Sequence, residues 1–516
     1  MQRPVVVYAG EIIMSLVSNL FLLFVLASVL VYYIVPHKWQ WLALLVFSYI
    51  YYIAGGLRFV VFILFSTIVT WLAALMIEKV ETKGNHKAAR KILIFGLILN
   101  FGMLGGVKYT NFAIENLNAL FHMNLRGMAI LLPLGISFYT FQSSGYLLDV
   151  YWKRCEAEKH PLKYALFVSF FPQILQGPIG RYSRLANQLY APHKFEGKNI
   201  ARGFERILWG FFKKMILADW AAVFVDEIFA NPDQYSGLAL IGILLYTLQL
   251  YADFSGGMDV VIGIASMFGI ELDENFKRPF FAVSVTDFWH RWHITLGTWM
   301  KDYVFYPFSL SKAMNKLGKF FKKHSKTRFG KYMAKALPIC LADLLIFFIV
   351  GVWHGAAWKY IVYGMYNGII MSFSSIMAPV YEKMFKITHI NKNARWYRGW
   401  QIIRTFILVN ISWYFDNAAT LTDAFRLMGN TFKHASFSMD AVVKMSGSQL
   451  DLIILLAGCL VWLIISILKE KGIVIREALD RKPLIIRWAV YIALVISVAM
   501  LGYISNTSGG FMYAQF

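Results

Sequence analysis

Long apolar runs, separated by short polar connections, dominate this chain of 516 residues. A helix of about 20 apolar residues crosses the hydrocarbon core of a bilayer. Shorter apolar runs are typical of helices that are tilted, re-entrant or extended beyond the apolar residues. The pattern therefore predicts an all-α polytopic membrane protein. The predicted spans lie near residues 12–35, 41–54, 59–77, 92–106, 129–149, 203–225, 237–252, 338–353, 356–377, 403–415, 452–468 and 488–504.

Two further apolar segments are interrupted by glycine or proline. Residues 164–180 contain Phe171-Pro172 and Gly177-Pro178, and residues 254–270 contain several glycines. Such backbone is tolerated at membrane depth where protein or a water-filled cavity satisfies its polar groups, so we expect re-entrant or broken helices here. The first apolar run lacks a basic segment and a small-residue cleavage site, which indicates a retained helix.

Composition agrees with this pattern: 58% of the residues are hydrophobic and the mean hydropathy is +0.54. The 51 Lys and Arg residues exceed the 29 acidic residues by 22 charges. The excess lies in a few connections, which the positive-inside rule places in the cytoplasm. These connections are residues 78–91, 151–163, 312–335, 383–404 and 469–487. Counting spans outward from them places residues 417–450 and the C-terminus outside.

Membrane topology explains this charge, and no soluble basic fold that would bind nucleic acid is visible. Residues 312–335, with nine basic residues and no acidic one, are also expected to contact anionic membrane lipid. The three cysteines show no CxxC spacing, and HExxH, Walker and GxGxxG motifs are absent. We therefore expect no metal site, no bound cofactor and no disulfide framework. The whole chain, residues 1–516, is expected to form one membrane domain.

A charged and aromatic segment, DFWHRWH, begins at Asp287. Ionisable groups in a membrane protein's apolar surroundings are costly and often mark a reaction centre or pathway. A single helix from Asp287 to Tyr306 would place Asp287 one turn from Arg291 and bring His290 close enough to His293 to line a common groove. It would also place His293 on one face with Trp289, Leu296 and Met300. The alternative is an amphipathic helix at the membrane interface.

His354 follows the apolar run 336–352 and stands between Trp353 and Gly355. The glycines Gly351 and Gly355 would allow another backbone or a substrate to approach closely. A neutral imidazole in this setting is suited to act as a general base toward a sugar hydroxyl. A packing histidine that is hydrogen-bonded to a carbonyl is an equally good interpretation of the residues alone.

The order of the block DFWHRWHITLGTWMKDYVFYP, a basic loop and GVWHGAAW resembles the membrane-bound O-acyltransferase (MBOAT) superfamily. Other segments resemble its branch with the alginate O-acetyltransferase membrane subunit. They are PLGISFYTFQSSGYLLDVY at 133–151, FFPQILQGPIGRY at 170–182, YADFSGGMDVVIGIASMFGIELDENFKRPF at 251–280 and the terminal FMYAQF. The resemblance implies about eleven to thirteen transmembrane helices, with re-entrant or broken helices around a central tunnel and a motif core at about 130–380.

The resemblance implies that His354 is the catalytic histidine of the WHG motif and that His293 is the second motif histidine. The residues that it implies for substrate binding are Trp289, His290, Arg291, Trp292, Trp353 and Asp302. Two positions depart from the family pattern: His290 stands where Arg is common, and Gly257-Met258 stand where the alginate branch usually has Tyr-Ser. The second departure leaves open which polymer is modified.

The activity that the resemblance implies is acyl transfer, most simply of acetyl, in the biosynthesis of an exported polysaccharide. An acyl thioester, acetyl-coenzyme A or an acyl carrier protein, would act as the donor from the cytoplasm, as a substrate rather than a bound cofactor. The acceptor would be a hydroxyl of the polysaccharide or of an extracytoplasmic SGNH or esterase-like acyltransferase partner. The protein would lie in the cytoplasmic (inner) membrane and cross it many times.

Two other functions stay open. The related MBOAT branch transfers D-alanine to teichoic acid and shares both histidine motifs. A transporter or flippase for a lipid-linked sugar belongs to a different class, and it would use carboxylates within the membrane. The candidates for that role are Asp149, Asp253, Asp259 and Asp343. The absence of a visible internal repeat argues against the transporter.

Overall fold

A computed structural model describes residues 14–174, 176–433, 442–443, 445, 448–503 and 511. Helices make up most of this part of the chain, and an isolated bridge between Phe276 and Trp292 is its one β-type pairing. The all-α prediction is therefore confirmed. The start of the first predicted span, part of the 417–450 connection and the terminal FMYAQF apart from Phe511 lie outside the described residues.

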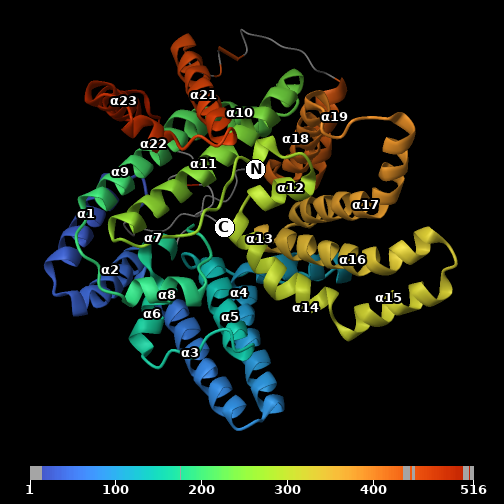
Figure 1. Cartoon of the computed structure of the whole chain (residues 1–516), viewed down its shortest axis with the longest axis horizontal. Helices are drawn as coiled ribbons and strands as arrows, with labels where there is room; N and C mark the ends of the chain where they lie inside the picture. The colour runs from blue at the N-terminus through green and yellow to red at the C-terminus, as the bar shows by residue number, and fades with distance from the viewer. Residues whose placement is uncertain are drawn as a thin grey trace. The chain divides into compact units, whose positions relative to one another are not determined.

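The chain forms two compact units. Figure 1 shows their helices coloured by position in the sequence. Unit 1 comprises residues 1–220, 250–273 and 482–516, and unit 2 comprises residues 221–249 and 274–481. The expected single membrane domain stays a prediction.

Seven helices among the described residues are long and apolar enough to cross a membrane. They are Leu57–Thr82, His86–Phe121, Ser236–Met267, Arg328–His354, Trp358–Thr388, Gln449–Glu470 and Leu484–Leu501, and Asn19–Ile34 is a shorter apolar helix. These helices fit a multi-pass membrane protein, whereas the expected number of eleven to thirteen spans stays a prediction.

Unit 1 contains the N-terminal helices and the last one. They are α1 (Asn19–Ile34), α2 (Gln40–Ala54), α3 (Val60–Thr82), α4 (His86–Phe121), α5 (Ile136–Tyr151), α6 (Pro161–Ser169), α7 (Phe171–Ile174), α8 (Tyr182–Tyr190), α9 (Gly197–Phe211) and α23 (Leu484–Ile496). The break between α6 and α7 confirms the interrupted segment predicted at 164–180. An ion pair of 3.2 Å from Lys153 to Glu81 joins the basic segments 151–163 and 78–91, as expected for loops on one side.

The expected interruption at 254–270 is wrong, because α11 runs unbroken from Ala239 to Met267. Its glycines have a different role. A Cβ at Gly256 would overlap the carbonyl oxygen of Gly210, and one at Gly263 would overlap that of Gly203. These glycines let α9 and α11 cross with their backbones in contact, so they are packing positions and not helix breaks.

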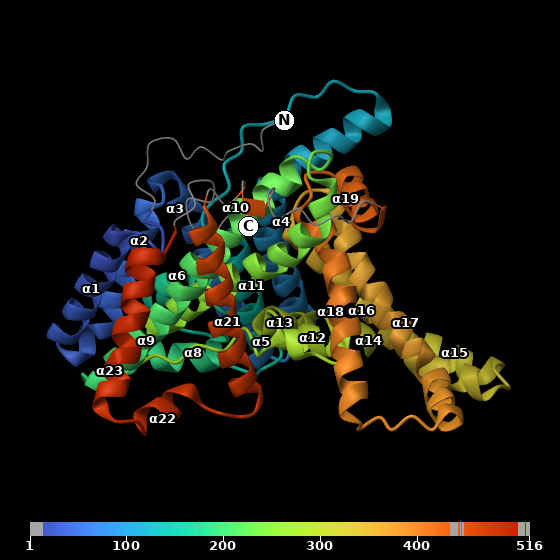
Figure 2. The ribbon, with the colours of Figure 1, turned by 90° about the horizontal axis from the view of Figure 1, so that it is seen from above.

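Unit 2 contains most of α10 (Asp219–Ala230), the first part of α11, up to Gln249, and ten further helices among the described residues. They are α12 (Val285–Arg291), α13 (Ile294–Met300), α14 (Tyr306–Ser309), α15 (Lys312–His324), α16 (Arg328–His354), α17 (Trp358–Thr388), α18 (Arg395–Asn417), α19 (Leu421–Lys433), α21 (Gln449–Glu470) and α22 (Ile475–Asp480). Figure 2 shows α15, α22 and the α17–α18 connection at one end of unit 2 and α19 at the other. The basic segments of this unit therefore gather at one end, as the predicted topology requires.

Candidate functional site

His354 is the last residue of α16, and its side chain is 5% exposed. The helices α16 and α17 approach closely here, because a Cβ at Gly351 would overlap the backbone of Tyr360. This confirms the predicted use of Gly351 for close approach by another backbone. The imidazole lies against aromatic rings, with a centroid distance of 5.0 Å to Tyr363 and 5.2 Å to Trp353.

A buried carboxylate faces this imidazole. Asp416, near the end of α18, places Oδ1 3.6 Å from Nδ1 of His354, and both side chains are about 95% buried. The hydroxyl of Tyr246 donates a hydrogen bond of 2.6 Å to the other oxygen, Oδ2. The Lys359 ammonium donates to the main-chain carbonyl of Asp416 at 3.0 Å and so fixes the end of α18. At 3.6 Å the separation of His354 and Asp416 is longer than a hydrogen bond, and substrate binding can shorten it.

Sequence analysis did not identify Asp416. A usable signal existed, because Asp416 directly follows the apolar run 403–415, and carboxylates in such positions are costly. Tyr246 carries no comparable signal, since a tyrosine within an apolar helix is most often a packing residue. Its role depends on the approach of α11 to α18, which only the fold reveals.

His293 lies between two short helices. The expected single helix from Asp287 to Tyr306 is wrong, because α12 ends at Arg291 and α13 begins at Ile294. Between them His293 has φ 45° and ψ 53°, in the left-handed region that non-glycine residues seldom adopt. Hydrogen bonds to an extended neighbouring segment replace those of a helix: the Ile294 N–H donates to the Asn275 carbonyl, and the Lys277 N–H donates to the Arg291 carbonyl.

Asn275 determines which ring nitrogen of His293 carries the proton. The Thr295 backbone N–H donates to Oδ1 of Asn275 at 2.9 Å, which identifies this atom as the amide oxygen. Nδ1 of His293 lies 3.3 Å from the same oxygen and must therefore donate. Nε2 consequently bears the lone pair and is a hydrogen-bond acceptor.

Burial holds His293 neutral. Removal of the imidazole from water lowers its pKa to about 3, and the nearby imidazole of His354 acts in the same direction. Trp353 contacts both histidines, with ring centroids 5.8 Å from His293 and 5.2 Å from His354. Unit 2 thus brings together three of the predicted site residues, His293, His354 and Trp353.

The other predicted residues divide into two groups. Trp292 is buried against Trp413, with ring centroids 5.4 Å apart, and Trp289 donates from Nε1 to Asn367 at 3.3 Å. Arg291 forms the predicted ion pair with Asp287, with 2.9 Å between Nε and Oδ1, and also pairs with Glu470. These contacts place Trp292 and Arg291 in the framework of the site.

His290 and Asp302 are placed differently from His293. His290 is exposed on α12, whereas His293 is buried, so the expected common groove for the two histidines is wrong. The helix break at His293 is the reason, because it ends the helical period that would have aligned them. Asp302 is half-buried in a short π-helix at Lys301–Phe305.

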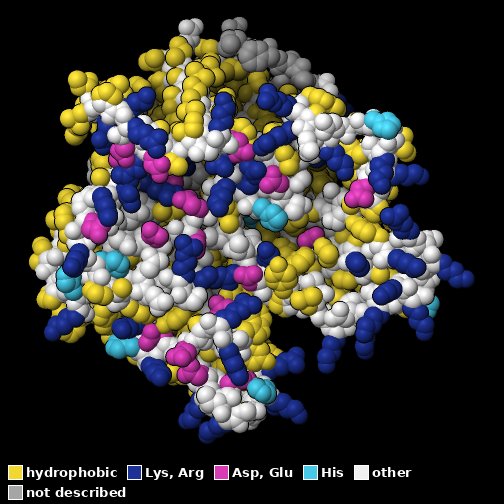
Figure 3. All heavy atoms as spheres, in the orientation of Figure 1, with side chains coloured by type: hydrophobic (Ala, Val, Ile, Leu, Met, Phe, Trp, Pro, Cys, Tyr) yellow, Lys and Arg dark blue, Asp and Glu magenta, His cyan; other side chains and the backbone are white. Residues whose placement is uncertain are grey.

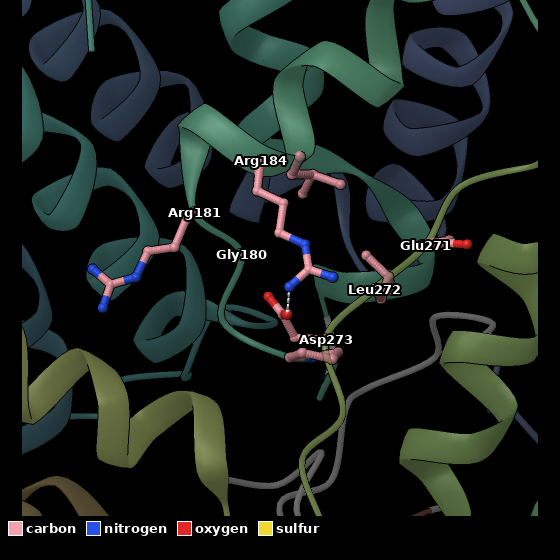
Figure 4. Close-up of a pocket in the computed structure, with 8 residues that line it drawn as sticks. Gly180, Arg181, Arg184, Glu271, Leu272 and Asp273 are labelled. Atoms are coloured by element: carbon pink, nitrogen blue, oxygen red, sulfur yellow. Dashed lines mark hydrogen bonds and ion pairs between the residues drawn. The ribbon is translucent and has the colours of Figure 1, made fainter. Parts of the chain in front are cut away.

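A small pocket in unit 1 is lined by none of these residues (Figure 4). Its lining includes Arg181, Arg184 and Asp273, and its volume of about 10 Å³ admits no more than one water. Arg184 reaches toward Asp273 and pairs with it, whereas Arg181 points away (Figure 4). Within the described residues, no group of three or more His, Cys, Asp or Glu side chains is arranged to hold a metal ion.

Comparison with known proteins identifies the family. The model of MBOAT, the membrane-bound O-acyltransferase family, matches residues 155–322. The chain is 31% identical to a probable alginate O-acetylase, AlgI, of Azotobacter vinelandii, over 86% of this chain and 83% of that protein. The chain belongs to the membrane-bound O-acyltransferase family. It is therefore a multi-pass membrane enzyme, an O-acyltransferase, as its motifs predict.

Other members of this family are also similar. A peptidoglycan O-acetyltransferase of Helicobacter pylori is 31% identical over 76% of this chain and 73% of that protein. A teichoic acid D-alanyltransferase of Bacillus subtilis is 32% identical, but over 54% of this chain and 67% of that protein. The similarity to the O-acetyl-transferring relatives thus extends over much more of this MBOAT chain.

Proposed function

We propose that this enzyme transfers an acetyl group from a cytoplasmic thioester to a hydroxyl group of an exported polysaccharide, or of a secreted partner that completes the transfer. The O-acetyl-transferring relatives support acetyl as the acyl group and a glycan as the acceptor. The observation that carries the proposal is the buried pair of His354 and Asp416, 3.6 Å apart. An imidazole held against a buried carboxylate is the arrangement that a general base requires.

In the proposed reaction His354 acts as the general base. Asp416 faces Nδ1 and favours the tautomer that carries its proton there, which leaves Nε2 to accept the proton of the acceptor hydroxyl. The hydroxyl oxygen attacks the thioester carbonyl, the carbon–sulfur bond breaks, and the thiolate takes the proton from the imidazolium. The Tyr246 hydroxyl stabilises the charge of Asp416 through its 2.6 Å hydrogen bond. General-base catalysis of this kind contributes about two to four powers of ten to the rate.

His293 has a different proposed role. Its Nδ1 proton is directed to Asn275, and its low pKa keeps the ring neutral, so that Nε2 accepts a hydrogen bond. The group that it would contact is an N–H or O–H of a substrate, such as an amide of the donor's pantetheine arm. His293 would therefore position the donor. Trp353, which contacts both imidazoles, would separate His293 from the general base His354.

The proposed direction of transfer is from the cytoplasm outward, across the cytoplasmic membrane. The basic segments 383–404 and 469–487 of unit 2 would attract the phosphates of acetyl-coenzyme A or an acidic acyl carrier protein. The partner that we propose outside is a secreted esterase-like acyltransferase of the SGNH type. No metal or bound cofactor is required by this chemistry, because the thioester is itself the activated donor.

The experiment is a transfer assay in proteoliposomes that contain the full chain. Radiolabelled acetyl-coenzyme A is supplied on one side, alginate or peptidoglycan fragments are supplied on the other, and label in the glycan is measured. The proposal is supported if the wild-type enzyme acetylates a glycan and the His354→Gln variant does not. Sugar flux without acetyl transfer would instead identify a transporter. If label reaches the glycan only after a secreted acyltransferase is added, the transfer requires that partner.

A second candidate is transfer of D-alanine to teichoic acid. The Bacillus subtilis relative favours it, since its 32% identity within the matched residues is similar to the 31% of the two O-acetyl-transferring relatives. The same assay distinguishes the two, because D-alanyl carrier protein would then be the active donor and acetyl-coenzyme A would be inert.

A further inference from the structure

The helix α15 and the start of α16 form a concentrated basic surface. Between residues 312 and 335 the chain has nine Lys or Arg residues, and all nine side chains are exposed. They are Lys312, Lys316, Lys319, Lys322, Lys323, Lys326, Arg328, Lys331 and Lys335. Figure 3 shows their dark-blue side chains at the right edge, over the position of α15 in Figure 1. We name these nine residues the basic face.

The charge of the basic face is not neutralised within the protein. None of its members forms an ion pair with another residue that the structure describes, and the segment itself has no acidic side chain. Elsewhere the basic residues are often paired. Arg278, Arg291 and Arg398 all contact the single carboxylate of Glu470, for example. The basic face is therefore available to an anionic partner from outside the chain.

Apolar side chains are interleaved with these charges. Phe320 is 57% exposed and Phe329 is 45% exposed, and Leu310 just before α15 is 68% exposed. On α15 the ring of Phe320 lies four residues after Lys316 and three before Lys323, so the three side chains share one helical face. Exposed phenyl rings beside lysines are typical of helices that lie in the headgroup region of a bilayer.

The helix α15 is also fixed relative to the membrane-spanning part of unit 2. A Cβ at Gly318 would contact the Ala334 carbonyl oxygen at 2.8 Å, so α15 packs backbone to backbone on α16. The hydroxyl of Tyr332 donates to the Ser375 carbonyl of α17 at 2.6 Å. Since α16 runs for 27 residues from Arg328 to His354, α15 lies at the entrance of a membrane-spanning helix.

We propose that the basic face binds the phosphodiester headgroups of anionic phospholipids in the bilayer that surrounds the protein. Lipid phosphates supply the missing negative charge, and the acyl region accepts Phe320, Phe329 and Leu310. A soluble acidic protein would match the charge but would also need an apolar surface of its own for these side chains, which the bilayer supplies without a specific partner. Lipid binding holds α15 on the membrane surface and thereby fixes the start of α16, the helix that ends at His354. This role is independent of the proposed acceptor and donor.

The test measures the depth of Phe320 in nanodiscs. Cys155, Cys340 and Cys459 are replaced by alanine, Phe320→Cys is labelled with an environment-sensitive fluorophore, and folding is checked by gel filtration and circular dichroism. Quenching by lipids brominated on the acyl chains is compared between phosphatidylcholine and mixed phosphatidylcholine–phosphatidylglycerol nanodiscs. We expect strong quenching only in the anionic nanodiscs. Salt at 0.5 M shortens the Debye length to about 4 Å, from about 10 Å at 0.1 M, and should remove most of the quenching.

Two matched variants locate the effect. The substitutions Lys316→Gln, Lys319→Gln and Lys323→Gln should abolish the lipid dependence, whereas Lys83→Gln, Lys87→Gln and Lys91→Gln, also exposed, should leave it unchanged. Equal quenching in the two lipid mixtures, or equal effects of the two triple variants, would overturn the proposal. A fluorescence change on adding acyl carrier protein to phosphatidylcholine nanodiscs would overturn it in favour of a protein partner.

Discussion

Oδ1 of Asp416 lies 3.6 Å from Nδ1 of His354, where the ends of α18 and α16 meet inside unit 2. A buried carboxylate is costly unless other groups compensate its charge. Here Tyr246 donates to Oδ2, and the imidazole faces Oδ1. This relationship connects the WHG motif to a residue outside the motif blocks, and it makes Asp416 a positioning residue for the proposed base.

Replacement of Asp416 by Asn should therefore impair catalysis without impairing donor binding. The amide keeps the shape of the side chain but removes the charge that orients His354 and stabilises its protonated form. We expect kcat to fall by about 10²-fold and the KM for the thioester to stay close to the wild-type value. Steady-state kinetics with Asp416→Glu, which should recover part of the loss, separates this role from packing. A rise in KM at constant kcat would contradict it.

His293 and His290 should behave differently, because one is buried beside Trp353 and the other is exposed on α12. His293→Ala should strongly lower acyl transfer, by raising the KM for the donor more than by lowering kcat. His290→Ala, as the matched control, should retain nearly full activity. Equal losses in both variants would show that the break between α12 and α13 does not separate their functions.

The stability of the enzyme should depend on His293 at acid pH. Its pKa in the folded protein is about 3, and in the unfolded chain it is about 6.5. The unfolded state therefore binds more protons between these values, so the full stability is present above about pH 6.5 and declines as the pH falls toward 3, by at most about 1.4 kcal/mol per pH unit. Thermal unfolding in detergent at pH 7 and pH 4.5 measures this. His293→Gln should show a smaller loss than the wild type, and an identical loss would refute the assignment.

Unit 1 contains a buried ion cluster whose removal should be costly. Nζ of Lys214 lies 2.8 Å from Asp219 and 2.7 Å from Asp253, and all three side chains are almost fully buried. Lys214→Met leaves two buried carboxylates without this cation and should destabilise the protein by about 3–5 kcal/mol. The matched control, Lys198→Met, breaks an exposed pair with Glu196 and should cost at most about 1 kcal/mol. Equal unfolding temperatures for the two variants would contradict this account.

Local patterns predicted much of the fold and part of the site. The apolar runs located α2, α3, α16, α17 and α21 because a membrane-spanning helix needs a continuous apolar sequence. The break between α6 and α7 was predictable from Pro172, whereas the glycines of α11 were misread. A glycine signals either a break or a close helix contact, and only the partner helix, here α9, decides between the two.

The site shows the same limit more sharply. Motif histidines His293 and His354 are visible in the sequence, but the backbone turn at His293 depends on hydrogen bonds with the segment that follows Asn275. The partners Asn275 and Asp416 are joined to the histidines by tertiary contacts between distant segments. No periodicity in a single segment encodes such contacts. A search for carboxylates beside apolar segments would have found Asp416, whereas no local pattern marks Asn275.

The most direct test of the central claim is the turnover of His354→Gln in proteoliposomes with labelled acetyl donor and a glycan acceptor. Glutamine retains the polarity of the site but cannot accept and return a proton near neutral pH. The account predicts a loss of acyl transfer of at least about 10²-fold, with an unchanged thermal unfolding temperature and unchanged donor binding. Turnover within a few-fold of the wild-type value in a folded, donor-binding variant would contradict the assignment of His354 as the base.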